Sequence, residues 1–91
     1  MERKNMLDRF LVGVDLPGET LLKIPLVEIL GEHRVLVENH QGVAGYSSCE
    51  VCVKVKFGII KISGQELTLS KMSGEQLVVS GCIDCVQVYM R

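Results

Sequence analysis

The chain has 91 residues, of which 47% are hydrophobic and 23% are charged. This composition is too apolar for a disordered chain, and the length suits a single domain. A net charge of −1 does not provide the basic face that neutralises several phosphates, so we expect no nucleic-acid partner. Because so small a domain buries only a modest share of its surface on folding, we expect stabilisation by association and predict a homo-oligomer.

The N-terminal sequence is not typical of a secretory signal. Asp15 interrupts the short apolar run that begins at Phe10, and no apolar stretch approaches the ~20 residues that span a bilayer. We therefore expect a cytoplasmic protein whose four cysteines stay reduced.

Residues 1–23 are predicted to form a helical lead-in, and residues 24–91 a β domain. The lead-in carries apolar residues at helical spacing, namely Met6, Leu7, Phe10, Leu11 and Val14. This amphipathic helix is expected to cover an open part of the sheet. Docking to another protein or to a membrane surface is the alternative.

After Pro25 the apolar pattern alternates with a period of two, which is typical of strands. The clearest strand is 50–57, where Val51, Val53, Val55 and Phe57 are predicted to face the core. The other predicted strands are 26–30, 34–39, 42–47, 59–62, 65–69, 76–80 and 86–90.

A two-copy repeat runs through the last third of the chain. Each copy has a strand, a Ser-Gly corner and a second strand, and the corners end at Gly64 and Gly81. The second copy is two residues longer, which a bulge would absorb. These features predict an all-β fold, a small antiparallel sandwich or roll with a short N-terminal helix; a short solenoid is the further alternative.

Two Cys-x-x-Cys pairs raise the question of a zinc site. Four thiolates arranged in pairs are typical of tetrahedral zinc, but the 29 residues between the pairs exceed the usual spacing. A separation of three along a strand also sends two side chains to opposite faces. A four-cysteine zinc module therefore stays an alternative, with Cys49, Cys52, Cys82 and Cys85 as its ligands.

The segment Glu38-Asn39-His40-Gln41-Gly42 is predicted to be a hairpin turn. Asn39 and Gly42 would supply the left-handed backbone positions, and His40 would have no separate role. No nucleophile elbow, phosphate loop or metal motif accompanies the two histidines. We therefore expect no enzyme, no cofactor and no small-molecule substrate.

Three segments, in order and spacing, resemble the YabP/YqfC family of sporulation proteins. They are RVLVENHQGV at 34–43, GIIKISGQELTL at 58–69 and LVVSGCI at 77–83, and the most specific part is Glu38-Asn39-His40-x-Gly42. The lead-in, with Asp15-Leu16-Pro17 and Ile24-Pro25, is most similar to the YqfC branch.

The resemblance implies a non-enzymatic protein of the mother cell of an endospore-forming bacterium. It also implies a membrane-associated sporulation partner and a location in the mother-cell cytoplasm, extending to the membrane around the forespore. Together with the strand pattern, this favours a structural or adaptor module that assembles with itself and with that partner through exposed strands.

Overall fold

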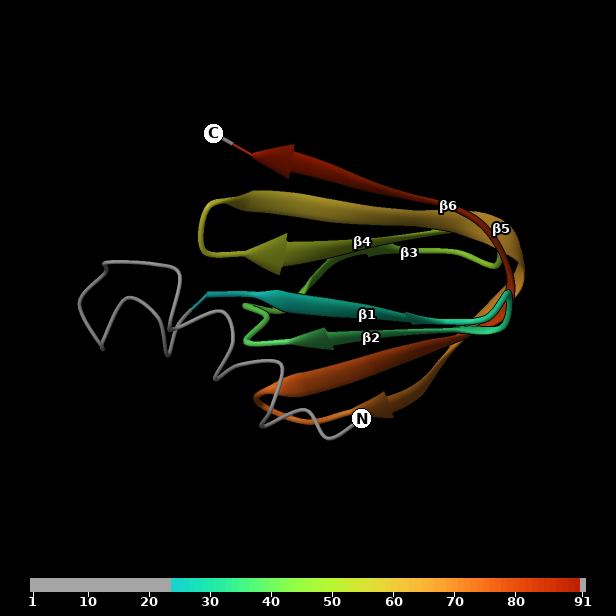
Figure 1. Cartoon of the computed structure of the whole chain (residues 1–91), viewed down its shortest axis with the longest axis horizontal. Coiled ribbons are helices and arrows are strands. Elements are labelled where there is room, and N and C mark those ends of the chain that lie inside the picture. Colours follow the sequence, from blue (N-terminus) through green and yellow to red (C-terminus); the bar gives the residue numbers. More distant parts are fainter. Residues whose placement is uncertain (1–23, 91) are drawn as a thin grey trace.

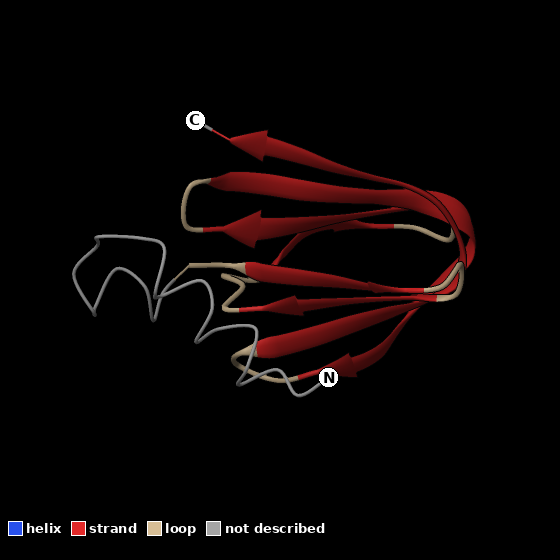
Figure 2. Cartoon of the chain, in the orientation of Figure 1, coloured by secondary structure: helices blue, strands red, loops and turns tan. Residues whose placement is uncertain are grey.

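The computed structural model describes residues 24–90, which form a single antiparallel sheet of six strands. The strands are β1 (Leu26–Leu30), β2 (Arg34–Glu38), β3 (Val43–Tyr46), β4 (Glu50–Val55), β5 (Gly58–Met72) and β6 (Gln76–Met90). Figure 2 shows that strands and short loops make up this part of the chain. The predicted all-β fold is thus confirmed, whereas the predicted helix of the lead-in lies outside the described residues. Within 24–90 we find no helix with the length and apolarity needed to cross a membrane.

The two longest strands, β5 and β6, give the sheet its shape. Each has 15 residues, and both curve together at one end of the molecule (Figure 1). The strand order is β1-β2-β6-β5-β4-β3, and β2 pairs with β6 only along Gln76–Ser80. Likewise, β4 pairs with β5 only along Gly58–Ser63. The bend therefore divides one continuous sheet into two parts.

We call these parts the β4 half and the β2 half. The β4 half contains β3, β4, the beginning of β5 and the end of β6. The β2 half contains β1, β2, the beginning of β6 and the end of β5. Both long strands run through both halves. The end of β6 is therefore the outer strand of the β4 half, and the end of β5 is the outer strand of the β2 half.

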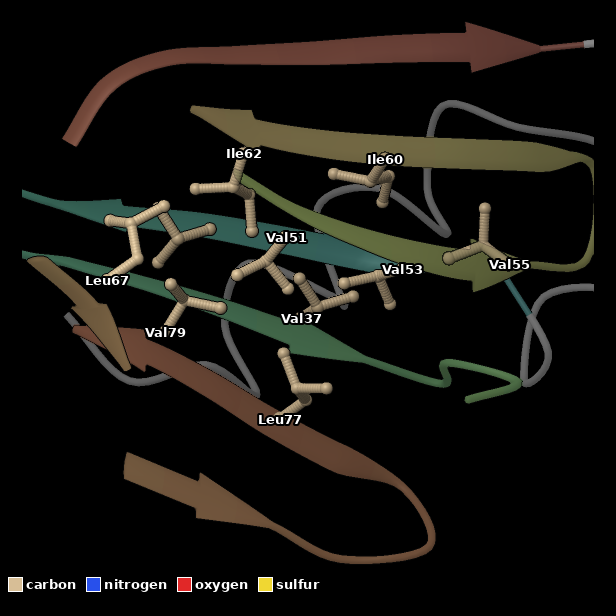
Figure 3. Close-up of a cluster of buried hydrophobic side chains, with 10 residues drawn as sticks. Val37, Val51, Val53, Val55, Ile60, Ile62, Leu67, Leu77 and Val79 are labelled. Carbon is tan, nitrogen blue, oxygen red and sulfur yellow. The ribbon is translucent and has the colours of Figure 1, made fainter. Parts of the chain in front are cut away.

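The core consists of aliphatic side chains from both halves, which point toward one another in Figure 3. Alternation along each strand places every second residue on this inner face. At about 25 cal/mol per Å² of apolar surface removed from water, the burial of these side chains is the main stabilising contribution. The β4 half contributes Val51, Val53, Val55, Ile60 and Ile62, and the β2 half contributes Val35, Val37, Leu77 and Val79.

Several predicted boundaries differ from the structure. The strands predicted at 59–62 and 65–69 are one strand, and so are those at 76–80 and 86–90. The Ser-Gly corners do not end a strand; they lie where the two strands bend together. Because all six strands belong to one sheet, neither a sandwich of two separate sheets nor a solenoid describes the fold. Phe57 lies in the turn after β4 and is 39% exposed, so its predicted core position is wrong.

Two turns cover the bend. Gly64 N–H donates to Cys49 O at 3.0 Å, and Leu67 N–H donates to Ser48 O at 2.7 Å. In the other half, Gly81 N–H donates to His33 O at 3.0 Å, and Ile83 N–H donates to Glu32 O at 2.7 Å. At the bend, β5 no longer pairs with β4 and β6 no longer pairs with β2. Carbonyl groups of the β3–β4 and β1–β2 turns accept the backbone N–H groups that have no strand partner there. The sequence repeat therefore corresponds to two matching bends, each held by a turn of its own half.

Candidate functional site

The segment predicted as a hairpin turn, Asn39–Gly42, is a connection between the two halves. It leads from β2 to β3, and these strands lie in different halves of the sheet and do not pair. The hairpin prediction is therefore wrong. The predicted left-handed positions are confirmed, since φ is 61° at Asn39 and 110° at Gly42. Asparagine and glycine are the residues that adopt this conformation most readily.

Asn39 fastens the connection at two points. Its backbone N–H donates to Glu75 O at 2.7 Å, and its Nδ2 donates to Ile24 O at 2.8 Å. The preceding residue, Glu38, accepts a hydrogen bond from Gln76 Nε2 at 2.9 Å. These contacts join the end of β2 to the start of β6 and to the residues before β1.

His40 lies within this connection and is 9% exposed. Its Nδ1 accepts the Gly42 N–H at 3.0 Å, so Nε2 carries the proton and donates to Ser73 O at 2.8 Å. Both ring nitrogens thus have backbone partners, one in its own connection and one in the β5–β6 turn. The expectation that His40 has no separate role is wrong, because the ring holds two distant turns together.

Gly64 and Gly81 lie at the bend, where backbones approach closely. A Cβ at Gly64 would collide with the carbonyl oxygen of Cys82. At Gly81, φ is 140° and a Cβ would lie 2.6 Å from Glu66 O. Neither position accommodates a side chain without backbone movement, so the two glycines allow the strands to bend.

The four cysteines do not gather into one group in the described part of the chain. Cys49, Cys82 and Cys85 are exposed, and Cys52 is half-buried on the outer face of β4. Within residues 24–90 no three histidine, cysteine, aspartate or glutamate side chains gather in a group that could hold a metal ion. The zinc alternative therefore has no support.

Cys52 has a distinct environment among these thiols. Burial raises its pKa, and the Glu50 carboxylate, 3.7 Å from its Sγ, raises it further, while Lys61 lowers it. Lys61 Nζ lies 3.1 Å from Glu50 Oε2, and hydrogen bonding to this carboxylate raises the pKa of Lys61. Cys52 therefore keeps its proton more firmly than an ordinary thiol does and is a weaker nucleophile at neutral pH.

A shallow hollow of about 410 Å³ opens next to this group on the β4 half. It is lined by Cys52, Gly58, Ile59, Lys61, Tyr89 and Met90. Ile59 and Tyr89 are cross-strand partners on β5 and β6, and both are exposed. The sequence does not single out Ile59 or Tyr89, although the apolar alternation of Val86, Val88 and Met90 indicates a strand there.

The described residues define a small all-β protein whose turns fasten two halves of one bent sheet. A model of the YabP family matches residues 24–89, and the chain belongs to this family. It is similar to YqfC, an uncharacterized protein of Bacillus subtilis (strain 168), with 28% identity over 87 residues, or 94% of each chain. No solved structure matches it. The resemblance seen in the sequence is confirmed.

Proposed function

We propose that the protein is a non-enzymatic structural or adaptor module of sporulation. In this proposal it acts in the cytoplasm of the mother cell, assembles with itself, and is recruited to the membrane around the forespore by a membrane-associated sporulation protein. Membership of the YabP family supports the link to sporulation. The observation that carries the adaptor role is the open sheet, whose outer strands expose large apolar side chains.

The chemistry of the side chains supports a binding role. His40 uses both ring nitrogens to hold the backbone, so it has no free lone pair for a substrate proton. Cys52 has a raised pKa, which disfavours the thiolate. By contrast, exposed strands and apolar side chains are features that sheet proteins use to bind other chains.

The proposal can be tested in an endospore-forming bacterium that carries this gene. Deletion is expected to lower the yield of heat-resistant spores, and the tagged protein is expected to co-purify with a membrane protein from sporulating mother cells. Cys52→Ser is the matched control for catalysis, and it should restore spore yield fully. A normal spore yield after deletion, or loss of function in a folded Cys52→Ser variant, would contradict the proposal.

A further inference from the structure

The end of β6, Ile83–Met90, forms an outer strand of the β4 half, and we call it the C-terminal edge. On one side it pairs with β5 through six consecutive positions, from Ser63↔Cys85 to Gly58↔Met90. On the other side no described strand pairs with it, because β2 reaches only Gln76–Ser80. This edge therefore presents a row of backbone donors and acceptors to an incoming strand.

The other three edges carry features that disfavour pairing. β3 has four residues and a register shift between Val43 and Gly45. β1 follows Pro25 and has Glu28 at its centre. The end of β5 has two register shifts and contains Lys71. Short length, bulges, proline and charge are the means by which natural sheets protect their edges.

The C-terminal edge lacks these features from Cys85 to Met90. This segment contains no proline, glycine or charged residue, and its pairing to β5 is regular. It also exposes large apolar side chains, since Val88, Tyr89 and Met90 are each more than half exposed. Val88 is on the same side of the sheet as Ile60, and Tyr89 is on the side of Ile59. An added strand would extend both faces.

We propose that the C-terminal edge pairs antiparallel with the same edge of a second copy of this chain. A twofold axis at Gln87 places Val86 opposite Val88 of the second copy, and Val88 opposite Val86, so β-branched residues meet on the core side of the sheet. Charge favours this direction. Asp84 lies near the start of the edge and Arg91 follows Met90 in the sequence, so antiparallel pairing directs each acidic end toward a basic end.

A small interface is typical of weak, reversible association. One edge strand with its neighbouring side chains is smaller than the ~800 Å² per partner of a standard interface. We therefore expect a reversible dimer with a Kd on the order of 10 μM. This proposal makes specific the self-assembly part of the proposed function and rests on it, but it does not depend on the membrane partner.

The first experiment is sedimentation of the full chain under reducing conditions, across a concentration series around that Kd. The wild-type protein should change from monomer to dimer as concentration rises. Val88→Lys should stay monomeric over this range, with a dimer Kd at least tenfold higher than that of the wild type. The reason is that the lysine ammonium would be buried at the new strand pair without an acidic partner. Ile29→Lys is the matched control: Ile29 is 57% and Val88 54% exposed, and both lie on outer strands. It should dimerise like the wild type.

A second experiment tests the register of the proposed strand pair between the two copies, and it does not depend on a loss of association. In a chain with all four cysteines changed to serine, Gln87→Cys should form an intermolecular disulfide rapidly, because residue 87 meets its own copy at the axis. Lys71→Cys, on another edge, should react slowly. A monomer at every concentration would overturn the inference, and so would a dimer lost with Ile29→Lys but kept with Val88→Lys. Dimerisation of a protein that fails to co-purify with membranes would contradict only the recruitment part of the proposed function.

Discussion

The Nε2 atom of His40 lies 2.8 Å from the carbonyl oxygen of Ser73, and this contact joins two turns that are 33 residues apart in sequence. The ring also accepts the N–H of Gly42, so a single buried side chain satisfies one backbone donor and one backbone acceptor. Such a contact is costly to remove, because both backbone groups would lose a partner away from bulk water.

We predict that His40→Ala destabilises the fold by about 2–4 kcal/mol, through the two lost hydrogen bonds and the space left by the ring. For a domain of this size each kcal/mol corresponds to about 4–8 °C in melting temperature. Thermal unfolding followed by circular dichroism measures this change. His33→Ala is the control, because that ring is exposed and makes one long contact of 3.4 Å. Equal melting temperatures for the two variants would contradict the role assigned to His40.

Asn39 combines a left-handed backbone with a side-chain hydrogen bond, and two substitutions separate these contributions. Asn39→Val should lower the free energy of unfolding by about 2 kcal/mol. A β-branched residue is strained at a φ of 61°, and the hydrogen bond to Ile24 is also lost. Asn39→Gly keeps the backbone conformation and should lower the free energy of unfolding by less than about 1 kcal/mol. Chemical denaturation gives both values. If valine is tolerated as well as glycine, the left-handed conformation does not contribute to stability.

The glycines at the bend should tolerate no side chain. Gly64→Ala and Gly81→Ala are each expected to cost about 3 kcal/mol or more, because the added Cβ meets backbone carbonyl groups that cannot move independently. Gly74→Ala provides the comparison, since a Cβ there meets no atom within 4 Å. The yield of folded protein and the melting temperature test this expectation. Stable, folded Gly64→Ala protein would show that the strands can separate at the bend.

The raised pKa of Cys52 predicts slow alkylation. Only the thiolate reacts, so at pH 7–8 a chain with Cys52 as its single cysteine should react with iodoacetamide more slowly than a chain whose single cysteine is the exposed Cys85. Glu50→Gln removes the negative charge beside the thiol, lowers its pKa and should increase the rate at a given pH. The pH dependence of the rate measures the pKa directly. An unchanged profile after Glu50→Gln would exclude this carboxylate as a cause.

The alternating pattern of Val51, Val53 and Val55 was sufficient to predict a strand and its buried face, because a period of two has a direct structural meaning. The left-handed position of Asn39 was also predictable, since few residue types adopt it. The pairing of β2 with β6 was not predictable from local pattern. Arg34 and Ser80 are partners although they are 46 positions apart in the sequence, and no single tight turn connects the two strands and fixes their register.

The role of His40 was missed for the same reason. Its immediate neighbours, Asn39 and Gly42, are turn residues, and they suggested a hairpin in which His40 had no separate role. Its second partner, Ser73, comes close only because β6 pairs with β2. The exposed group of Ile59 and Tyr89 likewise depends on the pairing of β5 with β6, and each residue alone resembles any other apolar residue of a strand.

The bend shared by β5 and β6 has a consequence for how the chain folds and unfolds. Each long strand crosses from one half to the other. A fragment that ends at Ser80, within β6, would therefore keep the strands of the β2 half but leave the β4 half without its outer strand. The short Ser73–Glu75 turn connects β5 and β6, so this hairpin closes a small loop. Pairing of β2 with β6 closes a much longer segment of chain, which costs more conformational entropy. We therefore expect residues 24–90 to unfold in one cooperative transition, with the hairpin as the segment around which both halves assemble.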